Sequence, residues 1–98
     1  MIFTKSYKLR IDEKAEGIYR YAAWKIENQI SEPDIIIEGG ILEFEGSGGN
    51  HTFRFKSNAY TYEVSIIEIG AEDEPDAELE VLKDDKIILT EGGKIKRN

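Results

Sequence analysis

Residues 13–31 read EKAEGIYRYAAWKIENQIS, and this stretch decides the predicted fold class. At about 100° per residue, one face of a helix would collect its apolar side chains, which are Ala15, Ile18, Tyr19, Ala22, Ala23, Ile26 and Ile30. Asp12 before the stretch is a suitable helix N-cap, and Pro33 after it blocks continuation. We therefore expect one amphipathic helix over residues 13–31, with its apolar face packed against a sheet.

The rest of the chain alternates between apolar and polar residues, as half-buried strands do. The alternating segments are residues 2–11, 51–56, 60–66 and 79–83, and the apolar segments 35–45 and 87–89 are predicted strands as well. Short turns join the later segments, which favours antiparallel neighbours and a meander. The sequence thus predicts an α+β domain in which one helix packs on a curved antiparallel β-meander of five to six strands, in the order β-α-β-β-β-β.

This element order resembles the cystatin-like layout, in which a curved antiparallel sheet grips one helix. The resemblance concerns the architecture alone, because the chain lacks the inhibitor-type motif Gln-x-Val-x-Gly. A fold analogy of this kind implies no function. We expect a single domain over residues 1–98, with residues 92–98 as a frayed tail that begins at Gly92 and Gly93.

Two glycines, Gly39 and Gly40, interrupt the apolar segment 35–45 and permit two interpretations. They could form a two-residue hairpin turn. They could instead form a bulge that bends one long strand around the helix. We favour the bulge, because the two arms of a hairpin would be short.

The composition excludes several classes of protein. The chain has 98 residues, 20 of them acidic and 13 basic, a net charge of −7 and no cysteine. Such acidity opposes binding to phosphate backbones, so we expect no nucleic-acid partner. Without cysteine there is neither a disulfide scaffold nor a thiolate zinc site. No apolar stretch approaches the ~20 residues of a membrane span, so we expect no membrane association. We expect a soluble cytoplasmic protein, with a trimmed signal peptide as the alternative.

The sequence offers few groups for catalysis. His51 is the only histidine, and no serine has the context of a nucleophile. The glycine-rich residues 46–49 precede a predicted strand, whereas a phosphate cradle precedes a helix. Carboxylates in the acidic run 72–76 could hold Ca²⁺, but the spacing of an EF-hand is absent. We therefore expect no enzymatic activity, no cofactor and no metal site.

Trp24 lies opposite the apolar face of the predicted helix, together with Gly17, Tyr21 and Asn28. Trp and Tyr are enriched in interface hot spots, and a glycine beside them would let a partner backbone approach closely. The alternative is that a terminal segment or a loop folds over this face. These four residues form the predicted protein-interaction surface.

Two functions follow as hypotheses. The favoured one is a non-enzymatic protein-interaction module that binds a protein partner or a second copy of itself. Its contact surface would be the Trp24 face, a sheet edge or the acidic loop. The alternative is a small-ligand-binding domain with a pocket between helix and sheet, whose polar groups would be Tyr19, Tyr60, Tyr62 and His51.

Overall fold

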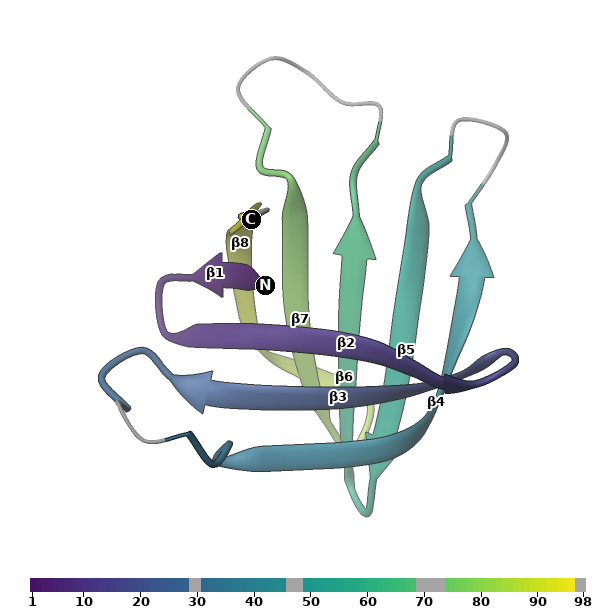
Figure 1. Ribbon diagram of the computed structural model, residues 1–98, viewed down its shortest axis with the longest axis horizontal. Coiled ribbons are helices and arrows are strands. Elements are labelled where there is room, and N and C mark those ends of the chain that lie inside the picture. Colours follow the sequence, from purple (N-terminus) through teal and green to yellow (C-terminus); the bar gives the residue numbers. More distant parts are fainter. Residues whose placement is uncertain (29–30, 46–48, 69–73, 97–98) are drawn as a thin grey trace.

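The described part of the structure, a computed structural model, comprises residues 1–28, 31–45, 49–68 and 74–96. These residues form eight antiparallel strands that pair in chain order and close into a barrel (Figure 1). The strands are β1 (Ile2–Thr4), β2 (Tyr7–Ala15), β3 (Ile18–Lys25), β4 (Ile35–Phe44), β5 (His51–Ser57), β6 (Tyr60–Ile66), β7 (Ala77–Lys83) and β8 (Lys86–Ile95). Within the described residues, no helix is long and apolar enough to cross a membrane.

The predicted helix over residues 13–31 is wrong, and with it the α+β class and the cystatin-like layout. The segment instead completes β2, turns at Glu16 and Gly17, and forms β3. Gly17 has a φ of 74° in this turn, a conformation that glycine adopts without steric strain. Alternate residues of β3 then face the core, namely Tyr19, Tyr21 and Ala23. The same apolar residues therefore fit a period of two as well as a helical period.

Side chains from every strand fill the barrel interior. The largest fully buried ones are Tyr21, Phe55, Leu9, Leu79 and Val64. The ring centroid of Tyr21 lies 5.3 Å from those of Phe55 and Tyr62. Four aromatic residues of the later strands contribute to the core, namely Phe53, Phe55, Tyr60 and Tyr62. Phe55 is fully buried, and the other three are partly buried and pack against the core.

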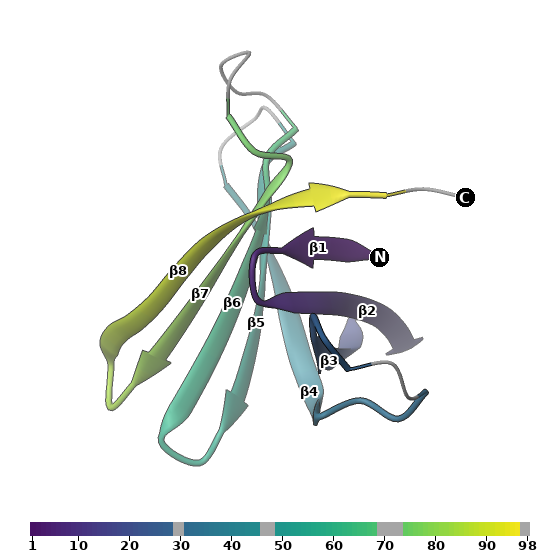
Figure 2. The ribbon, with the colours of Figure 1, turned by 90° about the vertical axis from the view of Figure 1, so that its left-hand side faces the viewer.

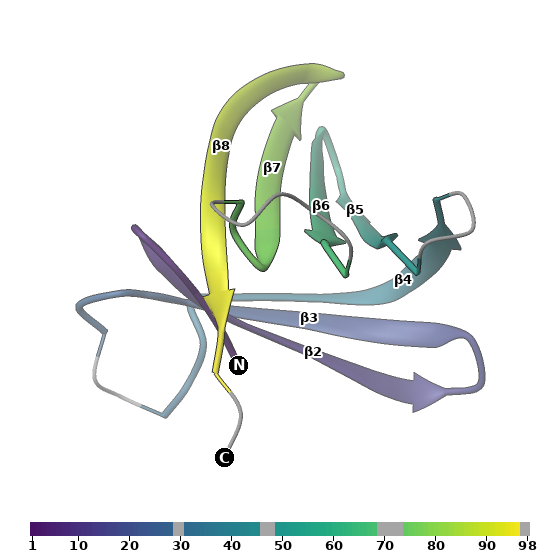
Figure 3. The same cartoon turned by 90° about the horizontal axis from the view of Figure 1, so that it is seen from above.

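Strand β4 bends as it passes from one neighbour to the other (Figure 3). Its first half pairs with β3 and its second half with β5. At the bend, Glu38 and Gly39 lie opposite the single residue Arg20, which defines a bulge. Figure 1 shows the consequence, since β2 and β3 cross in front of β5, β6 and β7 at a large angle. The bulge interpretation of Gly39 and Gly40 is confirmed, and the hairpin is excluded.

A side chain at Gly40 would not fit beside the core. A Cβ atom built at this position would overlap the ring of Phe55, which is completely buried. The close approach of the β4 backbone to the core ring thus depends on the missing side chain.

The barrel closes at β1, which has only three residues. It pairs with β2 at Ile2 and Phe3 and with β8 at Ile2, Phe3 and Thr4. The partners in β8 are residues 93–95, so these residues belong to the barrel. The predicted frayed tail is therefore wrong for residues 92–95, while residues 97–98 lie outside the described part. The three residues of β1 therefore close the barrel between β2 and β8.

Candidate functional site: an open strand edge beside the barrel closure

The first half of β8 has only one neighbouring strand. Residues 86–93 pair with β7, whereas β1 pairs with β8 only at residues 93–95. Figure 2 shows β8 and β2 diverging on either side of β1. Of the strands in the described residues, none other than β7 pairs with residues 86–92. Backbone N–H and C=O groups on the outer side of this stretch are therefore available to an added strand.

The open edge of β8 carries exposed isoleucines. Ile87 is 59% exposed and Ile88 is 56% exposed. Ile88 is the extra residue of a bulge, because Leu82 pairs with Ile87 and Val81 pairs with Leu89. A bulge kinks the strand and so restricts the shapes of partner that can pair with it. The open edge of β8 thus combines exposed apolar side chains with a kink in the strand.

A tight turn sets the register of this edge. Asp84 and Asp85 have φ values of 50° and 65°, and they connect Lys83 directly to Lys86. Positive φ at both positions is the signature of the hairpin turn that matches the twist of antiparallel strands. The turn therefore fixes which residues of β8 pair with β7.

Glu91 marks the point where the open edge meets the barrel closure. Its carboxylate accepts two hydrogen bonds from Ser6, from the backbone N–H at 3.0 Å and from the hydroxyl at 2.6 Å. Burial by itself would raise the pKa of Glu91, but the hydrogen bonds from Ser6 and Thr4 and the nearby charge of Lys5 outweigh it. The net pKa lies below the ordinary glutamate value. The charged form of Glu91 therefore holds the turn between β1 and β2 against β8.

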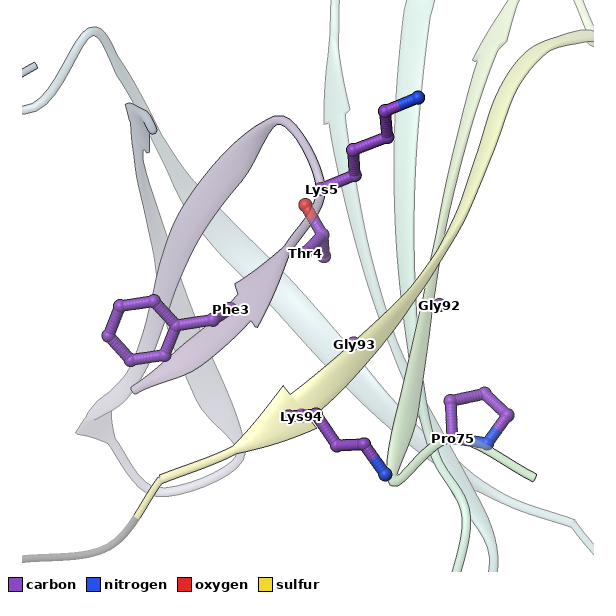
Figure 4. Close-up of a pocket in the computed structure, with 7 residues that line it drawn as sticks. All are labelled: Phe3, Thr4, Lys5, Pro75, Gly92, Gly93 and Lys94. Carbon is purple, nitrogen blue, oxygen red and sulfur yellow. The ribbon is translucent and has the colours of Figure 1, made fainter. Parts of the chain in front are cut away.

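A groove lies at the same corner (Figure 4). Its volume is about 420 Å³, and it is lined by Phe3, Thr4, Lys5, Pro75, Gly92, Gly93 and Lys94. Figure 4 shows Lys5 and Lys94 on either side of the two glycines. A Cβ atom at Gly92 would lie 3.2 Å from the ring of Pro75, so the groove depends on a bare backbone floor. The groove continues the open edge of β8 up to β1.

The predicted interaction surface does not exist as one surface, because the helix face that defined it is absent. Gly17 lies in the turn between β2 and β3, whereas Trp24 lies near the other end of β3, opposite Lys8. Tyr21 is 1% exposed and belongs to the core. Tyr21 is therefore buried among core side chains and is not exposed to a partner.

Trp24 and Asn28 do lie near one another, beside residues 31–34. The indole Nε1–H of Trp24 donates to the carbonyl of Ser31 at 3.2 Å. The side-chain amide of Asn28 donates to the carboxylate of Asp34 at 3.0 Å. A loop therefore folds against Trp24, which is the alternative that the sequence left open.

The residues of the predicted ligand pocket lie at two ends of the barrel. His51 begins β5 opposite Ile66, whereas Tyr60 begins β6 beside the turn at the other end of the same hairpin. The pocket between helix and sheet is excluded together with the helix. The groove at the barrel closure is lined by none of the four residues that the ligand hypothesis named.

Four aromatic rings form a continuous row at one end of the barrel, which we call the aromatic row: Tyr19, Phe53, His51 and Phe44. Successive ring centroids lie 4.9, 5.5 and 5.5 Å apart. Phe44 is 69% exposed at the outer end. The ring Nδ1–H of His51 donates to the carbonyl of Gly49 at 2.8 Å, which fixes the ring orientation. Sequence reasoning missed this row, because pairing across β3, β4 and β5 brings it together.

The outer face of the barrel carries two ion pairs of Arg54. Its guanidinium lies 2.6 Å from the carboxylate of Glu43 and 2.6 Å from that of Glu63. The hydrogen bond to Glu63 is the main reason that the pKa of Arg54 is raised. These contacts join β4, β5 and β6, so they stabilise the sheet and leave little of the guanidinium for a ligand.

Metal ligands do not gather in the part of the chain that the structure describes. Within residues 1–28, 31–45, 49–68 and 74–96, no three side chains of His, Asp or Glu are placed to hold an ion. Residues 72–73 of the acidic run lie outside these ranges, so the hypothesis of a Ca²⁺ site there is not tested.

Searches against protein-family models, curated proteins and solved structures found no match for this chain. The function is therefore argued from the geometry of the open edge and its surroundings.

Proposed function

We propose that this protein is a protein-interaction module that binds an extended segment of a partner protein as an added strand along residues 86–91 of β8. The proposal rests on one observation: this stretch of β8 pairs with β7 alone and exposes Ile87 and Ile88. In strand addition, main-chain hydrogen bonds supply affinity and alternate side chains supply specificity.

The barrel closure defines where such a segment would end. β1 pairs with β8 on the same side as the open edge, so an added strand would lie in line with β1. The turn at Lys5 and Ser6, held by Glu91, stands at the junction. We expect the bound segment to be short, because its length is limited by this turn at one end and by the hairpin turn at the other.

Peptide selection tests the proposal. Random peptides displayed on phage are selected against the immobilised protein, and enriched peptides are synthesised with and without N-methyl groups on alternate backbone amides. We expect Ile87→Lys to weaken binding at least tenfold, because the lysine would place a charge where the bound peptide covers the apolar side chain of Ile87. N-methylation should weaken binding similarly, because it removes main-chain hydrogen bonds. Isothermal titration calorimetry gives the affinities.

Ile18→Lys is the matched control, since Ile18 is a 49% exposed isoleucine on a different strand, β3. This variant should bind the selected peptides like the wild type. The proposal is overturned if no peptide is enriched, if both lysine variants bind equally well, or if N-methylated peptides retain full affinity.

A further inference from the structure

We infer that the aromatic row binds the cationic side chain of a basic, arginine-containing segment of a partner protein. This site is separate from the open edge of β8 and rests on different residues. Phe44 offers an exposed ring face, and His51 lies against it with a centroid distance of 5.5 Å. An aromatic face attracts a guanidinium or ammonium group through its quadrupole.

Two acidic residues that lie close to the row are Glu13 and Glu68. Glu13 lies opposite Tyr19 in the register of β2 and β3. Glu45 follows Phe44, and its Oε1 accepts a hydrogen bond from the hydroxyl of Thr52 at 2.6 Å. Its backbone N–H donates to the carbonyl of Asn50, the residue before His51, at 2.8 Å. Because Thr52 and His51 are consecutive residues of β5, their side chains point to opposite faces of the strand. The hydrogen bond to Thr52 therefore keeps the carboxylate of Glu45 on the face away from the row.

Glu68 follows the last residue of β6, Ile66, which pairs with His51. Its backbone N–H donates to the side-chain oxygen of Asn50 at 2.7 Å. Its Cβ lies 3.7 Å from the point where a Cβ on Gly49 would be. Glu68 therefore sits close to the residues that precede His51. The carboxylate of Glu43, by contrast, is already paired with Arg54.

The combination of ring faces and carboxylates selects a cation. Carboxylates alone would attract any positive charge, but the ring of Phe44 adds a preference for a planar, weakly hydrated guanidinium. The net charge of −7 accelerates the approach of a basic partner and repels nucleic acid. A basic protein segment is the partner that satisfies both features.

The test uses a short capped peptide that alternates Gly and Arg, titrated into the protein at about 0.15 M salt, where long-range attraction is largely screened. Two-dimensional NMR follows the ring signals of Phe44 and His51 and gives the affinity. We expect shifts to centre on these two residues. Phe44→Leu keeps an apolar side chain but removes the ring, and it should weaken binding roughly twofold to tenfold.

Ile41→Leu is the matched control, because Ile41 is a 48% exposed residue of the same strand. It should bind the arginine peptide like the wild type, whereas Glu68→Gln should bind it more weakly. Unchanged signals of Tyr21 and Phe55 would show that the core of each variant is intact. The inference is overturned if Phe44→Leu binds normally, if a peptide with Glu in place of Arg binds equally well, or if the shifts spread evenly over the acidic surface.

Discussion

Strands β2 and β8 flank the same barrel closure, yet their open edges differ in chemistry. Both have a single neighbour beyond the short stretch that β1 covers, and both contain a bulge, at Lys14 and at Ile88. The edge of β2 carries charges, namely Arg10, Asp12, Glu13 and Lys14. The edge of β8 instead carries the exposed apolar pair Ile87 and Ile88.

The difference shows how a barrel with two open edges keeps one of them from pairing with strands of other molecules. Charges and bulges discourage pairing between strand edges, because a partner strand would have to desolvate them. β2 uses both devices, whereas β8 relies on its bulge and on the flanking Lys86 and Glu91. The apolar edge of β8 is therefore the one at which we propose strand addition, and the following variants test how the two edges differ.

The largest effect is expected at Tyr21, on the strand that supports the edge of β2. Tyr21→Ala removes a fully buried ring and should lower the free energy of unfolding by about 3–5 kcal/mol. Urea denaturation measures the loss. Trp24→Ala, on the outer face of β3, is the control and should cost markedly less. Equal losses for the two variants would contradict the placement of Tyr21 in the core.

A smaller effect is expected at Gly93, where β1 crosses β8. A Cβ atom there would lie 3.0 Å from Cγ2 of Ile2 and 3.3 Å from the carbonyl oxygen of Phe3. Gly93→Ala should therefore destabilise the barrel by about 1–3 kcal/mol through overpacking. Hydrogen exchange should show faster exchange in β1 than in β7. Slower or unchanged exchange in β1 would show that the closure tolerates the methyl group.

Acid should loosen the same corner through Glu91. Because the folded-state pKa of Glu91 is lowered, its stabilising contribution is full above the ordinary pKa of about 4.3 and is lost as the pH falls through the folded value. Urea midpoints measured from about pH 7 to about pH 3 should fall more steeply for the wild type than for Glu91→Gln. Parallel curves would mean that Glu91 does not clamp Ser6.

The smallest change in stability is expected at the charged edge of β2. Asp12→Val removes one charge and a surface ion pair with Arg10, which should alter the free energy of unfolding by no more than about 1 kcal/mol. Its effect should appear in association instead, because the edge loses part of its protection. Light scattering at high protein concentration should show more oligomer than for the wild type. A monomer at every concentration would indicate that the remaining charges suffice.

Sequence reasoning succeeded where local chemistry decides the structure. The pattern of residues 51–56 and 60–66 predicts strands, and both exist as β5 and β6. The pair of glycines in segment 35–45 predicts a bulge, which β4 contains. The charge pattern offers Glu43, Glu45 and Glu63 as cross-strand partners of Arg54, and the structure pairs it with Glu43 and Glu63, because opposite charges on neighbouring strands attract.

It failed at residues 13–31, where the pattern fits two periods. The apolar residues of this segment satisfy a helical face and, over Tyr19, Tyr21 and Ala23, a strand face as well. Gly17 was the available signal for a turn, since glycine is unfavourable inside a helix and common in hairpins. The helical face that grouped Gly17, Tyr21, Trp24 and Asn28 is absent, and Tyr21 belongs to the core. A partner contact at Gly17, Trp24 or Asn28 stays a prediction.

The sequence by itself determined the features that depend on neighbours along the chain. These are the alternation of the strands, the turn at Asp84 and Asp85, the bend at Gly39 and Gly40, and the acidic surface. Only the tertiary structure decided that β1 would be too short to cover β8, and that Phe44 would join the aromatic row. Both depend on strand pairing between distant residues, whose register is set by the packing of the whole barrel and by no local preference.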